Sequence, residues 1–151
     1  MKEKALKISA KARYALRILL DVAVNASETM PRTGAAIAQA QQISEKFLSR
    51  IVVMLRRKGL LCSVRGNIGG FRLAMSPDDI RLIDVIEAVQ GPLAVIDCLL
   101  PGAACPRQGT CVAQRVWADV NATLVSTLSK VTLASILRRG PGGANALDFC
   151  I

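Results

Sequence analysis

The sequence predicts a mainly α-helical fold that carries one small β-hairpin and ends in a long helix. Three observations support this prediction. Apolar residues recur at three- and four-residue steps in several segments, the longest at 112–131. Two short strand-like runs flank a glycine-rich turn at 66–70. The 151 residues, 52% of them apolar, suffice for one compact domain, or for a small domain with an oligomerisation element.

Three helices are predicted in the first 60 residues. The first covers 9–26, where the apolar residues keep a helical spacing and Ser9 is placed to cap the N-terminus. A break containing proline and glycine separates it from a short helix at 35–41. Ser44 then caps a third helix, which ends near 58–59. Two short helices joined by a tight connection form a helix-turn-helix.

The predicted hairpin follows the third helix directly. Residues 60–65 and 71–75 have the composition of short strands, and the glycine-rich segment 66–70 between them is a turn. A hairpin in this position is a wing, so the first half of the chain is predicted to be a winged helix-turn-helix.

Two more helices are predicted in the second half. The fourth covers 80–89, with Pro77 at an early position and the acidic residues 78–79 in the first turn, where the helix dipole favours them. It stops at Gly91. The apolar stripe from 112 to 131 predicts a helix of about 25 residues. Little chain remains to cover so long a helix, so we expect its stripe to be buried against a second subunit.

The composition favours a polyanionic partner and excludes several enzyme classes. Lys and Arg number 20 against 11 Asp and Glu, and the formal net charge of +9 attracts nucleic acid. The absence of histidine removes Ser-His-Asp and Cys-His catalysis, and no other catalytic constellation is evident. No apolar run reaches the roughly 18 residues of a membrane-spanning helix, and the N-terminus lacks a signal-peptide core. We therefore expect a cytoplasmic protein that is not an enzyme and does not bind membranes.

A basic face on the third helix makes a double-stranded DNA operator the expected partner. Side chains near the start of a recognition helix point into the major groove, and a basic wing can enter the minor groove or clamp phosphates. The alternative is a solvated basic helix, which the arginines of the wing disfavour. The residues expected to contact DNA are Lys46, Ser49, Arg50, Arg56 and Arg57 on the helix, and Arg65 and Arg72 at the hairpin tip.

Cys98, Cys105 and Cys111 lie in a segment rich in glycine and proline just before the long helix. Thiolates are soft ligands that suit zinc or iron-sulfur clusters, and a flexible loop can wrap around a cluster. In a reducing cytosol, metal binding or redox sensing is more frequent than structural disulfides. The alternatives are a thiol switch without metal, a zinc site, and simple packing. We expect Cys62 to pack half-buried in the hairpin and Cys150 to be exposed.

Six short motifs, in order, resemble the Rrf2-type winged-helix regulators: RYALR at 13–17, ISEKFLSRI at 43–51, LRRKGL at 55–60, SVRG at 63–66, GGFRL at 69–73 and IDVIEAV at 83–89. The resemblance runs from about residue 7 to 138 and extends to the IscR-like and NsrR-like iron-sulfur regulators. It implies a bacterial homodimeric transcription factor whose long C-terminal helix forms the dimer interface. It also implies that Cys98, Cys105 and Cys111 hold an iron-sulfur cluster.

The resemblance does not supply a fourth cluster ligand. IscR-like members have a histidine where this chain has Gln114, and NsrR-like members use an aspartate of the partner subunit's first helix, at the position of Arg13. The alternatives are an open or solvent-bound iron, or ligation by Asp97, Gln114 or a residue from the partner subunit's N-terminus. Whether the cluster is 2Fe-2S or 4Fe-4S stays open.

These observations divide the chain into a winged-helix DNA-binding domain (1–90), a cysteine-rich cluster-binding loop (91–110), a dimerisation helix (111–138) and a flexible tail (139–151). The predicted function is a dimeric transcriptional regulator whose operator binding is controlled by an iron-sulfur cluster that senses iron, redox state or nitric oxide. We expect the cluster state to order or release the loop and so change the spacing of the two recognition helices. The alternative is a cluster-free regulator controlled by a thiol redox switch.

Overall fold

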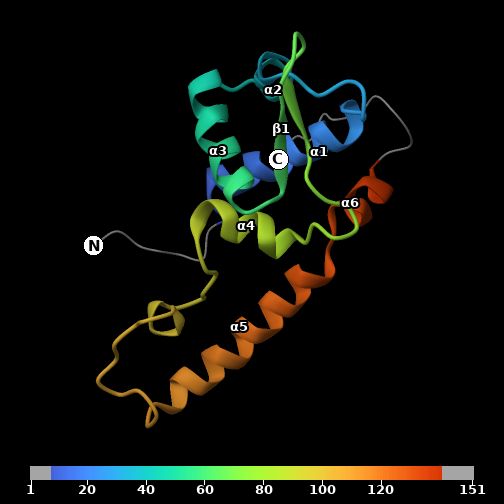
Figure 1. Cartoon of the computed structure of the whole chain (residues 1–151). Helices are drawn as coiled ribbons and strands as arrows, with labels where there is room; N and C mark the ends of the chain where they lie inside the picture. The colour runs from blue at the N-terminus through green and yellow to red at the C-terminus, as the bar shows by residue number, and fades with distance from the viewer. Residues whose placement is uncertain (1–7, 141–151) are drawn as a thin grey trace.

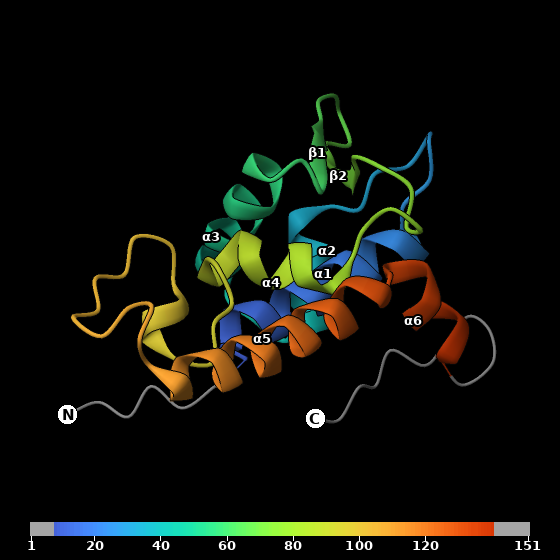
Figure 2. The same cartoon turned by 90° about the horizontal axis from the view of Figure 1, so that it is seen from below.

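The computed structural model describes residues 8–140, and it confirms a mainly α-helical fold with one small hairpin. Cys150 and most of the predicted tail lie outside these residues. The elements, in chain order, are α1 (Ala10–Asn25), α2 (Gly34–Gln41), α3 (Glu45–Arg57), β1 (Leu61–Val64), β2 (Gly70–Leu73), α4 (Leu82–Gln90), the 3-10 turn η1 (Asp97–Leu99), α5 (Val112–Lys130) and α6 (Leu133–Arg139). Figures 1 and 2 show α1 to α4 and the hairpin gathered in one unit, with α5 running along its side.

The first three helices begin at residues whose side chains cap them. The hydroxyl groups of Ser9, Thr33 and Ser44 each accept a backbone N–H from three residues further on, at 3.1, 3.2 and 3.2 Å. Such a bond satisfies an N–H that has no partner within the helix and contributes about 1 kcal/mol. The predicted caps at Ser9 and Ser44 are confirmed.

One apolar core holds the winged-helix unit together. Its most deeply buried side chains come from several helices, and burying each contributes about 1.5–3 kcal/mol. They include Ile18 and Leu19 of α1, Ile37 of α2, Ile51 and Leu55 of α3, and Val85 of α4. Because α3 buries one face in this core, the rotation of α3 about its own axis is determined, and so is the set of side chains on its outer face.

The two strands pair antiparallel, with Leu61 opposite Leu73 and Val64 opposite Gly70. The backbone of Arg32 adds a bridge to Phe71 on the outer side of β2. We call β1, β2 and the turn at 65–69 the wing. It occupies the predicted place directly after the third helix, although both strands are shorter than predicted.

The helix α4 begins later than predicted. The predicted first turn contained residues 77–79, but these form a separate turn and α4 begins at Leu82. The reason is a pairing with a distant segment: the Leu82 N–H donates to the Val131 carbonyl at 2.8 Å, and the Leu133 N–H donates to the Ile80 carbonyl at 2.8 Å. These bonds hold the backbone extended just before α4. The end of the helix at Gly91 is as predicted.

The long C-terminal helix predicted for 111–138 is interrupted. It ends at Lys130, and α6 begins at Leu133. Between them Thr132 forms a capping box, in which its hydroxyl accepts the Ser135 N–H at 3.1 Å and the Ser135 hydroxyl accepts the Thr132 N–H at 3.0 Å. Leu133 is 1% exposed, so α6 joins the core of the winged-helix unit, whereas α5 has no buried residue.

Candidate nucleic-acid interface and cysteine loop

The recognition helix α3 has an apolar inner face and a basic outer face. The inner face consists of the buried Leu48, Ile51, Val52 and Leu55. The residues predicted to contact DNA from this helix are all exposed on the other side: Lys46, Ser49, Arg50, Arg56 and Arg57. The B-DNA major groove is about 12 Å wide and admits an α-helix, so the exposed face of α3 can enter it.

Acidic side chains do not neutralise this basic face. The ion pairs among the described residues are Asp21–Arg32, Asp84–Arg81 and Asp78–Arg138. Within the described range, none of them involves a basic residue of α3 or Arg65. The charges of these basic residues are therefore available to a polyanion.

The start of α3 is held by both preceding helices. The rings of Tyr14 and Phe47 meet edge to face, with centroids 5.6 Å apart. The guanidinium of Arg17 lies 5.3 Å from the centre of the Tyr14 ring, and its Nε donates to Gln41 Oε1 at 2.9 Å. These contacts join α1, α2 and α3 next to Lys46, so they fix the end of α3 that is expected to enter the groove.

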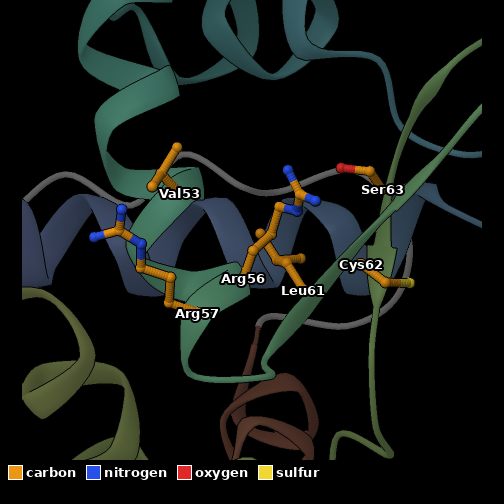
Figure 3. A pocket seen from close by; sticks show the side chains of 6 residues that line it. All are labelled: Val53, Arg56, Arg57, Leu61, Cys62 and Ser63. Atoms are coloured by element: carbon orange, nitrogen blue, oxygen red, sulfur yellow. The ribbon is translucent and has the colours of Figure 1, made fainter.

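A pocket of about 560 Å³ separates the C-terminal half of α3 from the wing (Figure 3). Figure 3 shows the side chain of Arg56 reaching toward Ser63, while the sulfur of Cys62 points away from both arginines. Guanidinium and hydroxyl groups are suitable donors to a phosphate oxygen. The lining residues are Val53, Arg56, Arg57, Leu61, Cys62 and Ser63.

The two wing arginines lie in different places. Arg65 is exposed in the turn after β1, as expected for the tip. Arg72 was also expected at the tip, but it lies within β2 opposite Cys62. Its Nη1 donates to the carbonyl of Glu28 at 2.9 Å, so its guanidinium points back toward the loop between α1 and α2. The cause is the strand register: the pairing continues to Gly70, so Arg72 lies inside β2, and the sequence pattern did not predict this register.

The three clustered cysteines lie on one loop but are not gathered into a site. Cys98 is part of η1, Cys105 lies in a turn, and Cys111 is the N-cap residue of α5. All three are free and partly buried. The described residues contain no group of three Cys, Asp or Glu side chains arranged to hold a metal ion. In donor type, three thiols suit an iron-sulfur cluster, and Gly102 and Gly109 have the positive φ angles (76° and 87°) that allow a tight loop.

The candidates for a fourth ligand differ in exposure. Asp97 is exposed beside Cys98, Gln114 is partly buried in the first turn of α5, and Arg13 is exposed on α1. Cys62 is partly buried, and its Sγ lies 3.7 and 3.8 Å from the carbonyls of Arg72 and Leu73, as expected for a packing role.

The helix α5 presents apolar side chains to solvent. Val112, Val116, Trp117 and Val120 are 74%, 57%, 45% and 44% exposed. Further along, Leu124, Val125 and Leu128 pack against the core of the winged-helix unit. The N-terminal half of α5 is thus an apolar surface without a partner among the described residues. None of the described helices is long and apolar enough to span a membrane.

A recognition helix with a free basic face, next to a two-stranded wing, defines a winged-helix DNA-binding regulator. The family model described as Rrf2, iron-dependent transcriptional regulator, matches residues 8–139. The chain belongs to the Rrf2 family of transcriptional regulators, and it is not an enzyme. Members of this family bind DNA.

Curated relatives and solved structures agree with this assignment. The chain is 34% identical over 133 residues to protein rrf2 of Nitratidesulfovibrio vulgaris, covering 88% of each chain. It is 35% identical to the transcriptional regulator IscR of Aliivibrio salmonicida, over 87% of this chain and 77% of the relative. Among structures, it is similar to CymR of B. subtilis, the global cysteine regulator (TM-score 0.73, 31% identity, 90% and 99% coverage). It is also similar to T. potens IscR (TM-score 0.71, 29% identity, 93% and 94% coverage).

Proposed function

We propose that the chain binds an operator with the start of α3 in the major groove and the wing tip on the neighbouring minor groove or phosphates. The observation that carries this proposal is the basic face of α3, which forms no ion pair within residues 8–140, next to the exposed Arg65. Lys46, Ser49 and Arg50 meet base edges or nearby phosphates, and Arg56 and Arg57 meet phosphates. Arg72 serves the same site by holding β2 in place. The proposal locates the protein in the bacterial cytoplasm, with the chromosome.

The experiment that tests this proposal begins by selecting a binding duplex from a random-sequence DNA pool with the wild-type protein. Fluorescence anisotropy then gives the affinity of each variant for that duplex. Arg50→Ala is expected to weaken binding by about tenfold or more, because one specific contact contributes about 1–3 kcal/mol. Lys130→Ala removes the same charge from α5 and is the matched control. Equal losses in both variants would show that only net charge matters.

The proposed partner of α5 is a second copy of the chain. The N-terminal half of this 19-residue helix carries several exposed apolar residues. A twofold axis would pack this apolar surface of one subunit against the same surface of the other. Both recognition helices of such a dimer would face two operator half-sites about one DNA turn apart.

The cysteine loop is proposed to bind an iron-sulfur cluster through Cys98, Cys105 and Cys111. Such a cluster supplies reversible redox chemistry when bound. The loop is linked directly to the proposed dimer helix, because Cys111 precedes its first residue and the Val95 N–H donates to Asn121 of α5 at 3.0 Å. A change in the loop would therefore reach α5, and through it the spacing of the two recognition helices.

The second candidate is a thiol switch without metal. It is favoured by the finding that the three thiols are free, partly buried and not gathered as a ligand set among the described residues. Two thiols of the loop would form a disulfide, giving up two electrons and two protons to a cellular disulfide oxidant. The signal would then be redox potential alone.

Anaerobic purification separates these candidates. The visible spectrum, iron content and sulfide content are measured for wild type and for Cys105→Ala. A cluster predicts a coloured protein with stoichiometric iron and sulfide, both lost in the variant. A colourless wild type that stays free of iron after reconstitution would leave the thiol switch.

A further inference from the structure

An ion pair with a buried carboxylate joins α1 to the connection between α1 and α2, which pairs with the wing. Asp21 of α1 is 0% exposed. Its Oδ1 lies 3.2 Å from Arg32 Nη2 in an ion pair and accepts a hydrogen bond from Asn25 Nδ2 at 2.5 Å. Burying charges costs several kcal/mol, and an apolar replacement of a buried pair is often just as stable. Asp21 Oδ2 and Arg32 Nε have no hydrogen-bond partner among the described residues, so stability alone does not account for the pair.

Arg32 also joins three elements of the DNA-binding unit. Its N–H donates to the Phe71 carbonyl at 3.0 Å and its carbonyl accepts the Phe71 N–H at 2.9 Å, which attaches it to β2. A Cβ on Gly70 would lie 2.5 Å from the Arg32 carbonyl oxygen, so the close approach requires glycine there. The next residue, Thr33, caps α2. The side chain of Arg32 thus anchors the wing and the start of the helix-turn-helix to α1.

A second anchor holds the same strand. Arg72 donates from Nη1 to the carbonyl of Glu28 at 2.9 Å. Arg72 follows Phe71, and Glu28 and Arg32 belong to the same connection between α1 and α2. The base of the wing is therefore attached on both sides of Phe71, while the turn that carries Arg65 lies beyond the last paired residues, Val64 and Gly70.

We propose that Asp21 and Arg32 are positioning residues for DNA binding: their ion pair fixes the angle of the wing relative to α3, so that Arg65 meets the duplex while α3 occupies the groove. This inference rests on the proposed function. A charged pair with defined geometry selects one arrangement, whereas an apolar contact tolerates sliding. The pair touches no DNA itself and acts through Arg65.

A double-mutant cycle tests this role with the selected duplex as the probe. Asp21→Asn keeps the shape of the side chain and removes its charge. We expect Asp21→Asn and Arg65→Ala each to weaken binding about tenfold and to reduce the magnitude of the slope of log affinity against log salt by about one per bound subunit, because each subunit loses one phosphate contact. The double variant should bind no more weakly than Arg65→Ala alone. Asp78→Asn is the control, because Asp78 forms an exposed pair with Arg138.

A merely structural role would give a different result. Additive losses, about a hundredfold in the double variant, or an unchanged salt slope in Asp21→Asn, would overturn the positioning role and leave the proposed DNA contacts standing. Full affinity of Arg65→Ala would instead overturn the proposed wing contact, and the positioning role with it.

A second pair of variants covers the case in which Asp21→Asn does not fold. Arg32→Lys keeps a cation for Asp21 and the backbone bridge to Phe71, whereas Arg32→Gln keeps only the bridge. We expect Arg32→Lys to bind within about threefold of wild type, and Arg32→Gln to lose about tenfold in affinity together with one unit of salt slope per bound subunit. Equal affinities and slopes for the two variants would contradict the proposal.

Discussion

The winged-helix unit and the cysteine-α5 region differ in how deeply their side chains are buried. The unit from α1 to α4, with α6, surrounds a core in which side chains such as Ile18 and Leu55 are 0% exposed. The helix α5 buries none of its 19 residues, and the loop before it, yellow in Figures 1 and 2, projects away from the core. The first region presents the surface proposed to bind DNA. The second carries three free thiols and an apolar face that no described residue covers.

The two regions also differ in what their polar contacts hold in place. Polar contacts in the winged-helix unit, such as Arg17 with Gln41 and Arg32 with Asp21, fix the orientation of α3 and the wing. In the other region, the Val95–Asn121 hydrogen bond is a contact that joins the loop to α5. A signal that acts on the thiols would therefore change the less constrained region first and leave the DNA-reading surface intact.

The largest expected effect contrasts the cores of the two regions. Leu55→Ala removes a side chain that is 0% exposed, so it should lower the free energy of unfolding by about 2–5 kcal/mol. Arg115→Ala, at an exposed and charged position of α5 outside its apolar face, should change it by less than about 0.5 kcal/mol. Urea denaturation of both variants measures this. Similar losses would show that α5 is as tightly packed as the winged-helix core.

The apolar face of α5 should respond through assembly. Trp117→Ala removes the largest exposed apolar side chain of α5, and truncating such an anchor costs about 2–4 kcal/mol of association. The dimer dissociation constant should rise correspondingly, as measured by sedimentation at several concentrations. Arg115→Ala, an exposed and charged position on the same helix, is the control. A monomeric wild type, or a dimer unaffected by Trp117→Ala, would contradict the proposed partner.

A smaller effect is expected at the base of the wing. Gly70→Ala forces a Cβ to within 2.5 Å of the Arg32 carbonyl oxygen, so it should destabilise the protein by about 1–3 kcal/mol and weaken DNA binding. Gly34→Ala meets only ordinary contacts at 3.6 Å or more and should be neutral or stabilising by about 0.5–1 kcal/mol. Thermal unfolding compares them. Equal stabilities would mean that the backbone of Arg32 can shift to accommodate a side chain at residue 70, which would contradict a tightly fixed wing base.

Local signals in the sequence predicted most of the winged-helix unit. The caps at Ser9 and Ser44, the glycine-rich turn and the stop at Gly91 depend on neighbours along the chain; the structure has the caps and the stop as predicted, and the turn at 65–69 instead of 66–70. The errors arose where distant segments pair. The start of α4 and the break before α6 depend on the contact between residues 80–82 and 131–133, which no local pattern reveals.

The candidate site divides in the same way. Helical spacing alone placed Lys46, Ser49 and Arg50 on one exposed face, because the apolar stripe identified the opposite face. The direction of Arg72 depends on its partner Glu28, far away in sequence. The buried Asp21 was missed, although a single acid among the apolar positions of the first helix was a signal that could have identified it. The spacing of the three cysteines in the sequence predicted a shared loop, and the structure places them on one loop without gathering them into a ligand set among the described residues.

One measurement tests most directly the claim that a complete DNA reader is controlled through its thiols. The affinity for the selected duplex is measured anaerobically, before and after reconstitution with iron and sulfide, for wild type and for the variant with alanine at Cys98, Cys105 and Cys111. The account predicts that wild-type affinity changes about tenfold or more between the two states, while the variant binds DNA without responding. A wild type with the same iron content and affinity as the triple variant in both states would contradict it.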